Sequence, residues 1–138
     1  MHVILDSNII ISAFIYGGTP QEVLDTCVQE QTIQLIHSQD IVNECLQTIQ
    51  KTRLQQAVKK ANKNKKDFIE YFTNLSKCYS PSMNEQYCVR DKDDEHVLAL
   101  AEQTQASYIV TGDKDLLVLK TIGTTQIVTA KQFLKLFN

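Results

Sequence analysis

Residues 2–8 read His2-Val3-Ile4-Leu5-Asp6-Ser7-Asn8. A short apolar run that ends in polar residues is consistent with a β-strand buried on both faces, as in parallel sheets. Asn8 can cap a short helix that follows this strand and reaches Phe14. Asp6 then lies at the carboxyl end of a strand, which is the edge where open α/β sheets bind ligands.

The same alternation of strand and helix continues along the chain. We expect further strands at residues 33–36, 108–111 and 126–128, and helices at 19–29, 38–49, 54–61, 67–75, 93–105 and 129–137, with a short helix or turn at 113–119. The two helices on either side of the basic segment 59–66 are predicted to be separate, and Asp67 with Glu70 forms a capping box for the second. Residues 77–90 are expected to be a loop or to contain a short strand. Such alternation predicts a parallel sheet that helices cover on both faces.

The composition is that of an ordinary globular protein. The chain has 138 residues, of which 43% are hydrophobic and 22% charged, enough for one domain spanning residues 1–138. No apolar run approaches the ~20 residues of a membrane span, and no basic and apolar leader is evident. We therefore expect a cytoplasmic protein that does not bind membranes.

The net charge of −2 conceals a basic segment. Seven of the 14 basic residues lie between positions 51 and 66, with no acid among them. They are Lys51, Arg53, Lys59, Lys60, Lys63, Lys65 and Lys66. Such a segment is either a solvated face or a surface that contacts phosphates in a salt-dependent way.

Four acids that are distant in sequence each follow an expected strand or begin an expected helix. They are Asp6, Glu44, Asp94 and Asp113. Two carboxylates ~4 Å apart repel each other by about 4 kcal/mol at a surface-like dielectric. A bound divalent cation would keep such a group of carboxylates ionised, so the pattern indicates a metal site for phosphate chemistry.

Asp94 is distinguished by its helical phase. The buried stripe of the helix that follows it consists of Val97, Leu98, Ala101 and Thr104. At about 100° per residue, Asp94 projects from this same face, where an unpaired charge is costly. Asp94 could instead cap the helix, although the adjacent Asp93 can fill that role.

The other acids have structural alternatives too. Asp113 follows Thr111-Gly112, so it either lines the sheet edge with the Thr111 hydroxyl or belongs to a plain Gly-Asp turn. Asp115 could line the same edge or cap a helical turn. Glu44 lies about 60° outside the apolar stripe of its helix, so it either flanks a cleft or faces water.

The histidines and cysteines do not indicate a zinc site. His96 is expected to point away from the stripe that carries Asp94, and His2 and His37 lie at strand ends. The four cysteines include no Cys-x-x-Cys pair, so they are interpreted as small core residues. Oxygen ligands without imidazole favour Mg²⁺ or Mn²⁺ over Zn²⁺.

The ordered set of motifs resembles the PIN-domain ribonucleases, in particular the PIN toxins of bacterial toxin–antitoxin systems. The motifs are Leu5-Asp6-Ser7-Asn8, residues 38–44, residues 90–101, residues 108–116 and Ile127-Val128-Thr129 with Phe133. The resemblance implies a three-layer α/β/α sandwich around a mostly parallel sheet. It also implies that Asp6, Glu44, Asp94 and Asp113 bind Mg²⁺ or Mn²⁺ and catalyse, with Asn8, Thr111 and Asp115 in support.

We therefore expect a metal-dependent endoribonuclease that leaves 5′-phosphate and 3′-hydroxyl ends. The candidate partners are an RNA substrate, a small antitoxin protein and a second copy of the chain. The RNA would be held by Lys59, Lys60, Lys63, Lys65, Lys66, Arg90 and Lys114. The alternative is a non-catalytic module whose acidic face binds a protein or RNA. A phosphatase that uses Asp6 as its nucleophile is disfavoured, because Asn8 stands where such chemistry needs a second acid.

Overall fold

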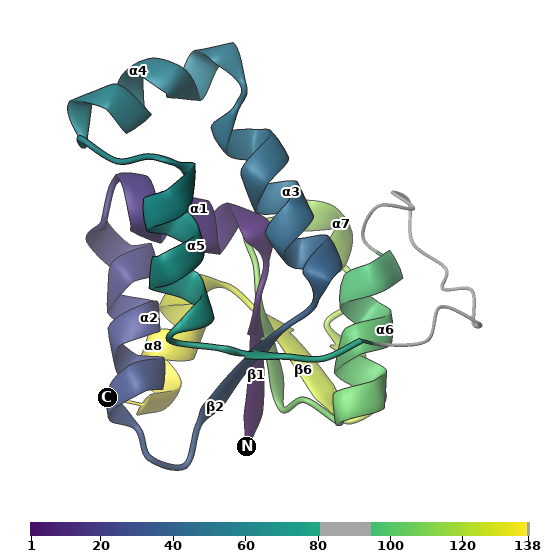
Figure 1. Cartoon of the computed structure of the whole chain (residues 1–138). Helices are drawn as coiled ribbons and strands as arrows, with labels where there is room; N and C mark the ends of the chain where they lie inside the picture. Colours follow the sequence, from purple (N-terminus) through teal and green to yellow (C-terminus); the bar gives the residue numbers. More distant parts are fainter. Residues whose placement is uncertain (81–94, 138) are drawn as a thin grey trace.

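Figure 1 shows a computed structural model of the chain, which describes residues 1–80 and 95–137. The strands are β1 (His2–Leu5), β2 (Gln34–His37), β3 (Lys77–Cys78), β4 (Tyr108–Val110), β5 (Thr121–Ile122) and β6 (Thr125–Val128). The helices are α1 (Ser7–Ile15), α2 (Gly18–Gln29), α3 (Gln39–Ile49), α4 (Thr52–Lys60), α5 (Lys65–Thr73), α6 (Glu95–Thr104), α7 (Lys114–Leu117) and α8 (Ala130–Phe137). None of the described helices is long and apolar enough to cross a membrane.

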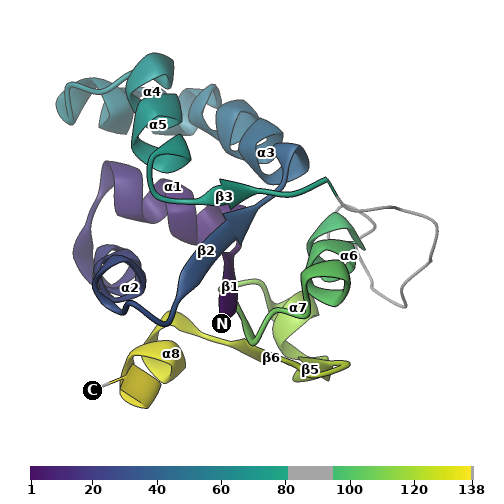
Figure 2. The same cartoon turned by 60° about the horizontal axis from the view of Figure 1, so that its bottom comes forward.

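The sheet has the strand order β3-β2-β1-β4-β6-β5. All neighbouring strands run parallel except β5, which is antiparallel to β6. In parallel sheets the crossovers place helices on both faces. Figures 1 and 2 show α1, α2 and α8 on one face and α6 with α7 on the other. The predicted three-layer α/β sandwich is therefore confirmed.

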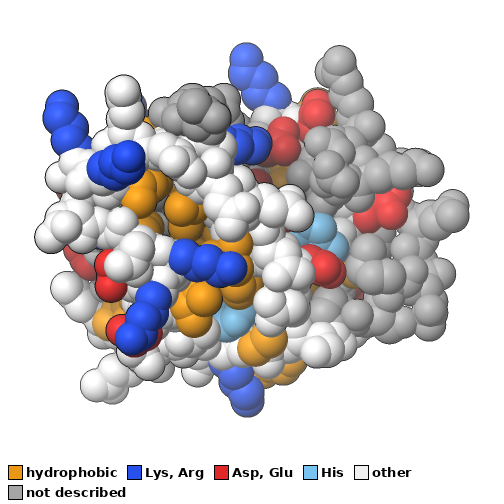
Figure 3. Space-filling model, turned by 45° about the horizontal axis from the view of Figure 1, so that its top comes forward, with side chains coloured by type: hydrophobic (Ala, Val, Ile, Leu, Met, Phe, Trp, Pro, Cys, Tyr) orange, Lys and Arg blue, Asp and Glu red, His pale blue; other side chains and the backbone are white. Residues whose placement is uncertain are grey.

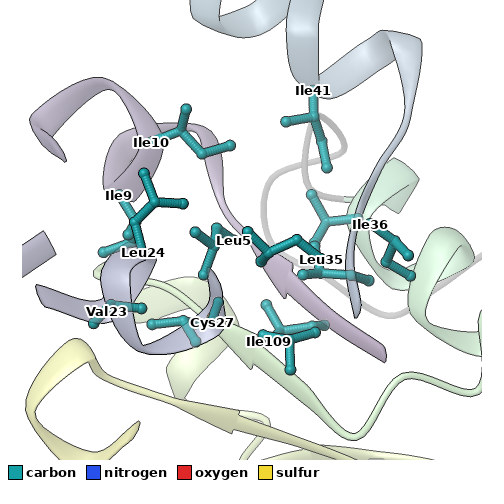
Figure 4. Close-up of a cluster of buried hydrophobic side chains, with 14 of the residues drawn as sticks. Leu5, Ile9, Ile10, Val23, Leu24, Cys27, Leu35, Ile36, Ile41 and Ile109 are labelled. Atoms are coloured by element: carbon teal, nitrogen blue, oxygen red, sulfur yellow. The ribbon is translucent and has the colours of Figure 1, made fainter. Parts of the chain in front are cut away.

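The centre of the sheet is β1, because it pairs with β2 on one side and β4 on the other. Its residues Val3 and Ile4 are 0% exposed and Leu5 is 2% exposed. Figure 4 shows Leu5 among side chains from α1, α2, α3 and the adjoining strands. Burial of each such aliphatic side chain stabilises the fold by about 1.5–3 kcal/mol. This packing fixes the carboxyl end of β1 in the middle of one sheet edge.

One helix start and one strand differ from the sequence predictions. The helix that follows the basic segment, α5, begins with a capping box between Asn64 and Asp67, not between Asp67 and Glu70. The strand β5 was not predicted, because two residues are too short to show an alternating pattern. The prediction of two separate helices, α4 and α5, is confirmed.

Candidate functional site

Asp6 occupies the junction between β1 and α1. Its backbone nitrogen donates to the Val110 oxygen at 2.9 Å, which extends the β1–β4 pairing by one residue. Its Oδ1 accepts from the Ser7 nitrogen at 2.8 Å, so Asp6 is the N-cap of α1. The residue is only 4% exposed. Asp6 thus provides a buried carboxylate, and it also fills the capping role that had been assigned to Asn8.

One hydroxyl joins Asp6 to Asp113. The Thr111 side chain follows β4, is 0% exposed and donates from Oγ1 to Asp6 Oδ2 at 2.7 Å. The same oxygen accepts from the Asp113 nitrogen at 3.0 Å. Asp113 then caps α7, because its Oδ1 accepts from the Asp115 nitrogen at 2.9 Å. Thr111 therefore fixes the ends of two neighbouring strands relative to each other.

Glu44 reaches this edge from α3. Its Oε2 accepts from the Ser7 hydroxyl at 3.0 Å, next to Asp6 in the chain. The Cys45 thiol contacts the Ser7 carbonyl at 3.9 Å, which holds the two helices together. About a third of the Glu44 side chain (32%) is exposed, so the carboxylate is accessible to solvent. Glu44 thus contacts the residue that follows Asp6 while part of its side chain remains in solvent.

The remaining predicted site residues are more peripheral or lie outside the described ranges. Asn8 is exposed in the first turn of α1, and Asp115 is half-buried in α7. Asp94 and Arg90 lie outside the described residues. The structure thus brings together Asp6, Glu44, Thr111 and Asp113.

The comparison with protein families gives a match to the PIN domain over residues 2–115, a range that includes all four predicted acids. The chain belongs to the PIN domain family. Its fold is similar to that of a chain in the crystal structure of VapBC2 from Rickettsia felis bound to a DNA fragment from their promoter. The TM-score is 0.64 and the identity is 12%, over 94% of this chain and 98% of that chain. Comparison with curated proteins gives no significant match.

His96 is a residue of this PIN domain that sequence reasoning missed. Its Nε2 donates to Glu44 Oε1, and the histidine is 9% exposed. The phase argument failed because residues 96–101 of α6 are all buried, so this part of the helix has no solvent-facing side. The His96 Nδ1 atom is buried and has no hydrogen-bond partner among the described residues. Together with Ser7, His96 fixes the orientation of the Glu44 carboxylate.

The acids of the PIN domain act on one another electrostatically. Burial raises the pKa of Asp6, and the hydrogen bonds from Thr111 and Ser7 only partly offset it. The negative charges of Glu44 and Asp113 raise the pKa further. Both neighbouring charges that shift this pKa are therefore negative, which is an environment that favours a bound cation.

Two buried groups near Glu44, the imidazole of His96 and the thiol of Cys45, also have shifted pKa values. Burial lowers the pKa of His96, but the hydrogen bond and charge of Glu44, with the charges of Asp40 and Asp6, reverse this, so the net pKa is raised. Burial and the charges of Glu44 and Asp6 raise the pKa of the Cys45 thiol well above its usual range. Cys45 is therefore a protonated core thiol at neutral pH and does not serve as a nucleophile.

The donors of this edge fit a hard cation in type but do not enclose one by themselves. Within residues 1–80 and 95–137, no three His, Cys, Asp or Glu side chains form a group that could hold a metal ion. Mg²⁺ is commonly held by one or two carboxylates and keeps several waters. The buried Asp6 carboxylate, with Asp113 and Glu44 close enough to shift its pKa, matches this mode of binding.

Five of the predicted RNA-binding lysines lie in α4, in α5 or between them, whereas Lys114 is an exposed residue at the start of α7. Figure 3 shows lysine side chains around an apolar surface on the face that carries α4 and α5. Lys59, Lys60, Lys65 and Lys66 are exposed. Lys63 is half-buried, and its ammonium group donates to the Phe14 carbonyl and lies 4.7 Å from the centroid of the Phe14 ring. Lys63 therefore has a structural role, in contrast to its neighbours.

Proposed function

We propose that this PIN domain is a metal-dependent endoribonuclease that hydrolyses RNA phosphodiester bonds. The observation that supports the proposal most strongly is the hydroxyl bridge from Thr111 to Asp6 and to the backbone of Asp113. It holds two acids of a PIN domain at the carboxyl edge of the parallel sheet. Glu44 is held beside them by Ser7 and His96.

Each residue has a role in this proposal. Asp6 and Asp113 hold the metal, Glu44 is a further ligand or the base that orients the attacking water, and Asp94 completes the set on sequence grounds. Mg²⁺ or Mn²⁺ bound here would supply an acidified water and offset negative charge on the phosphate. Asp115 supports Asp113 through the start of α7. The family resemblance implies products with 5′-phosphate and 3′-hydroxyl ends.

Cleavage of RNA with matched variants tests this proposal. The purified protein should cleave single-stranded RNA in the presence of Mn²⁺ and lose this activity when the ion is chelated. Asp6→Asn and Asp94→Asn should each abolish cleavage. Glu30→Gln, which alters an exposed acid after α2, should cleave at the parental rate. Cleavage by Asp94→Asn at the parental rate would show that the proposed metal set is wrong.

We further propose that the protein is the toxin of a toxin–antitoxin pair and acts in the cytoplasm. The similarity of its fold to a chain of the VapBC2 complex supports this role. Expression of the parent in bacterial cells should arrest growth, whereas expression of Asp6→Asn should not. A small protein encoded beside the gene should restore growth and copurify with the chain. Growth arrest by Asp6→Asn would separate toxicity from RNA cleavage, and light scattering of the purified protein would test the proposed homodimer.

A further inference from the structure

Tyr16 is a large aromatic residue that the fold leaves in solvent. It follows the last residue of α1, and its backbone nitrogen donates to the Ser12 carbonyl at 2.9 Å. Gly17 and Gly18 adopt positive φ angles of 73° and 68°, which side-chain-bearing residues rarely adopt, and turn the chain into α2. Tyr16 remains 64% exposed. The hydrophobic core therefore gives no reason for an aromatic residue at this position.

Tyr16 forms one wall of an open groove against α4. The groove has a volume of about 720 Å³ and is lined by Tyr16, Gln56, Ala57, Lys59 and Lys60. This volume is within the range of about 300–1,000 Å³ that is common for ligand sites. The lining contains two cations and an amide but no acid. An anionic ligand with a flat group that can stack on a ring therefore complements it.

The walls of the groove are tied together by Lys63. Its ammonium group donates to the carbonyl of Phe14, two residues before Tyr16. Its backbone nitrogen donates to the Val58 carbonyl at 3.2 Å, at the end of α4. The turn after α4 is thus anchored to the last turn of α1. The groove is consequently a preformed feature of the fold.

The groove is connected to the acidic edge by α1. This helix has nine residues and begins directly after Asp6, so its length is about 13 Å at 1.5 Å per residue. Stacked nucleotides in one strand are about 3.4 Å apart. Tyr16 therefore lies at a distance from Asp6 that about four stacked nucleotides can span.

We propose that this groove binds single-stranded RNA, with a base stacked on Tyr16 and the phosphates held by Lys59 and Lys60. The inference rests on the proposed nuclease function, because it takes the strand bound at Asp6 as the occupant of a groove within its reach. Proteins that bind single strands combine a basic groove with aromatic platforms in this way. An acidic peptide would use the lysines but would gain little from an exposed ring beside a neutral amide.

Binding without catalysis tests the groove directly. The affinity for a labelled single-stranded RNA of about ten nucleotides is measured by fluorescence anisotropy with the divalent ions chelated. Tyr16→Ala should weaken binding by about 5- to 150-fold, the effect of losing one base–aromatic stack. Tyr16→Phe, which keeps the ring, should bind within about twofold of the parent. Because Tyr16 is exposed, both variants should keep the parental melting temperature.

The lysines have a separate readout. Replacing Lys59 and Lys60 together with glutamine should reduce the slope of log affinity against log salt concentration by about 1.4, or about 0.7 for each lost phosphate contact. The matched control replaces Lys131 and Lys135, two exposed lysines of α8, with glutamine. This control should leave the slope unchanged. An unchanged slope after replacement of Lys59 and Lys60 would overturn the assignment.

Two further outcomes decide between this proposal and its alternatives. Binding by Tyr16→Ala within about twofold of the parent would reject the stacking site, as would displacement of the RNA by polyglutamate as efficiently as by unlabelled RNA. These binding results are independent of the cleavage assay. If the parent fails to cleave RNA but the Tyr16 and lysine effects on binding are observed, the RNA-binding groove is supported and the nuclease function is refuted. If the parent cleaves RNA and the Tyr16 and lysine effects on binding are absent, only the RNA-binding groove is refuted.

Discussion

Replacement of Thr111 by valine tests whether one hydroxyl organises the acidic edge. Valine has nearly the same shape as threonine but cannot donate to Asp6 or accept from the Asp113 nitrogen. Because Thr111 is 0% exposed, water cannot replace these contacts without a rearrangement. The variant therefore separates the hydrogen bonds from the packing.

The magnitude follows from the two hydrogen bonds that are lost. The 2.7 Å bond to the Asp6 carboxylate is to a charged group and contributes about 1.5–3 kcal/mol. The 3.0 Å bond from the Asp113 nitrogen contributes about 0.5–1.5 kcal/mol. We expect Thr111→Val to lower the free energy of unfolding by about 2–4 kcal/mol. In a domain of 138 residues this corresponds to a decrease of roughly 7–14 °C in melting temperature.

The assay is urea unfolding of the metal-free protein, followed by circular dichroism at neutral pH. Thr111→Ser is the matched control, since it keeps the hydroxyl and removes one buried methyl group, at a cost of about 1 kcal/mol. The reasoning predicts that valine is clearly more harmful than serine. If Thr111→Val is as stable as the parent, or no less stable than Thr111→Ser, then the hydroxyl bridge does not hold the edge together.

Three further predictions concern the charges around this edge and one buried imidazole. Metal-free Asp6→Asn should be at least as stable as the parent at neutral pH, because it removes a buried charge near two like charges. Millimolar Mn²⁺ should raise the melting temperature of the parent but not that of Asp6→Asn. Differential scanning calorimetry measures both effects, and a Mn²⁺ response equal to that of the parent would contradict the metal site. His96→Leu should weaken the apparent Mn²⁺ affinity in cleavage assays by about 10- to 100-fold, and His96→Gln, which can still donate to Glu44, should lose less affinity. Tighter Mn²⁺ binding by His96→Leu would show that the imidazole opposes the ion. Burial lowers the pKa of His37, so this residue binds protons more readily in the unfolded chain, and its contribution to stability should decline as pH falls below about 6.5. In urea unfolding between about pH 7.5 and 5.5, His37→Asn should lose less stability than the parent, and parallel profiles would refute this assignment.

The strands were predictable because the central ones are buried on both faces. The segments that form β1, β2, β4 and β6 each contain a short apolar run, and a run of this kind has few alternatives when polar or turn residues end it. The strand ends then place Asp6 and Asp113 at one edge without any knowledge of contacts. The two-residue strands β3 and β5 lack such a run, since their pairing is set by neighbouring strands and not by their own composition.

Three features of the site depended on tertiary contacts that no local pattern reveals. His96 contacts Glu44 although its helical phase predicted otherwise. Residues 96–101 of α6 are all buried, so the phase of a residue does not show which neighbour it faces. Lys63 differs from the lysines around it only because α1 ends nearby and presents the Phe14 carbonyl. Glu44 was ambiguous by phase because the side of α3 on which it lies also packs against α1 through Ser7.

The capping role of Asp6 and its proposed catalytic role are not competing explanations. Asparagine, serine and aspartate cap helices about equally well, so α1 could begin at a neutral residue. A carboxylate at this position is instead desolvated and repelled by Glu44 and Asp113, both of which raise its pKa. The cap explains where the side chain lies, because it fixes one oxygen on the Ser7 nitrogen and leaves the other to Thr111. Since capping does not require the charge and folding is hindered by it, the charge supports the proposal that a cation binds this edge.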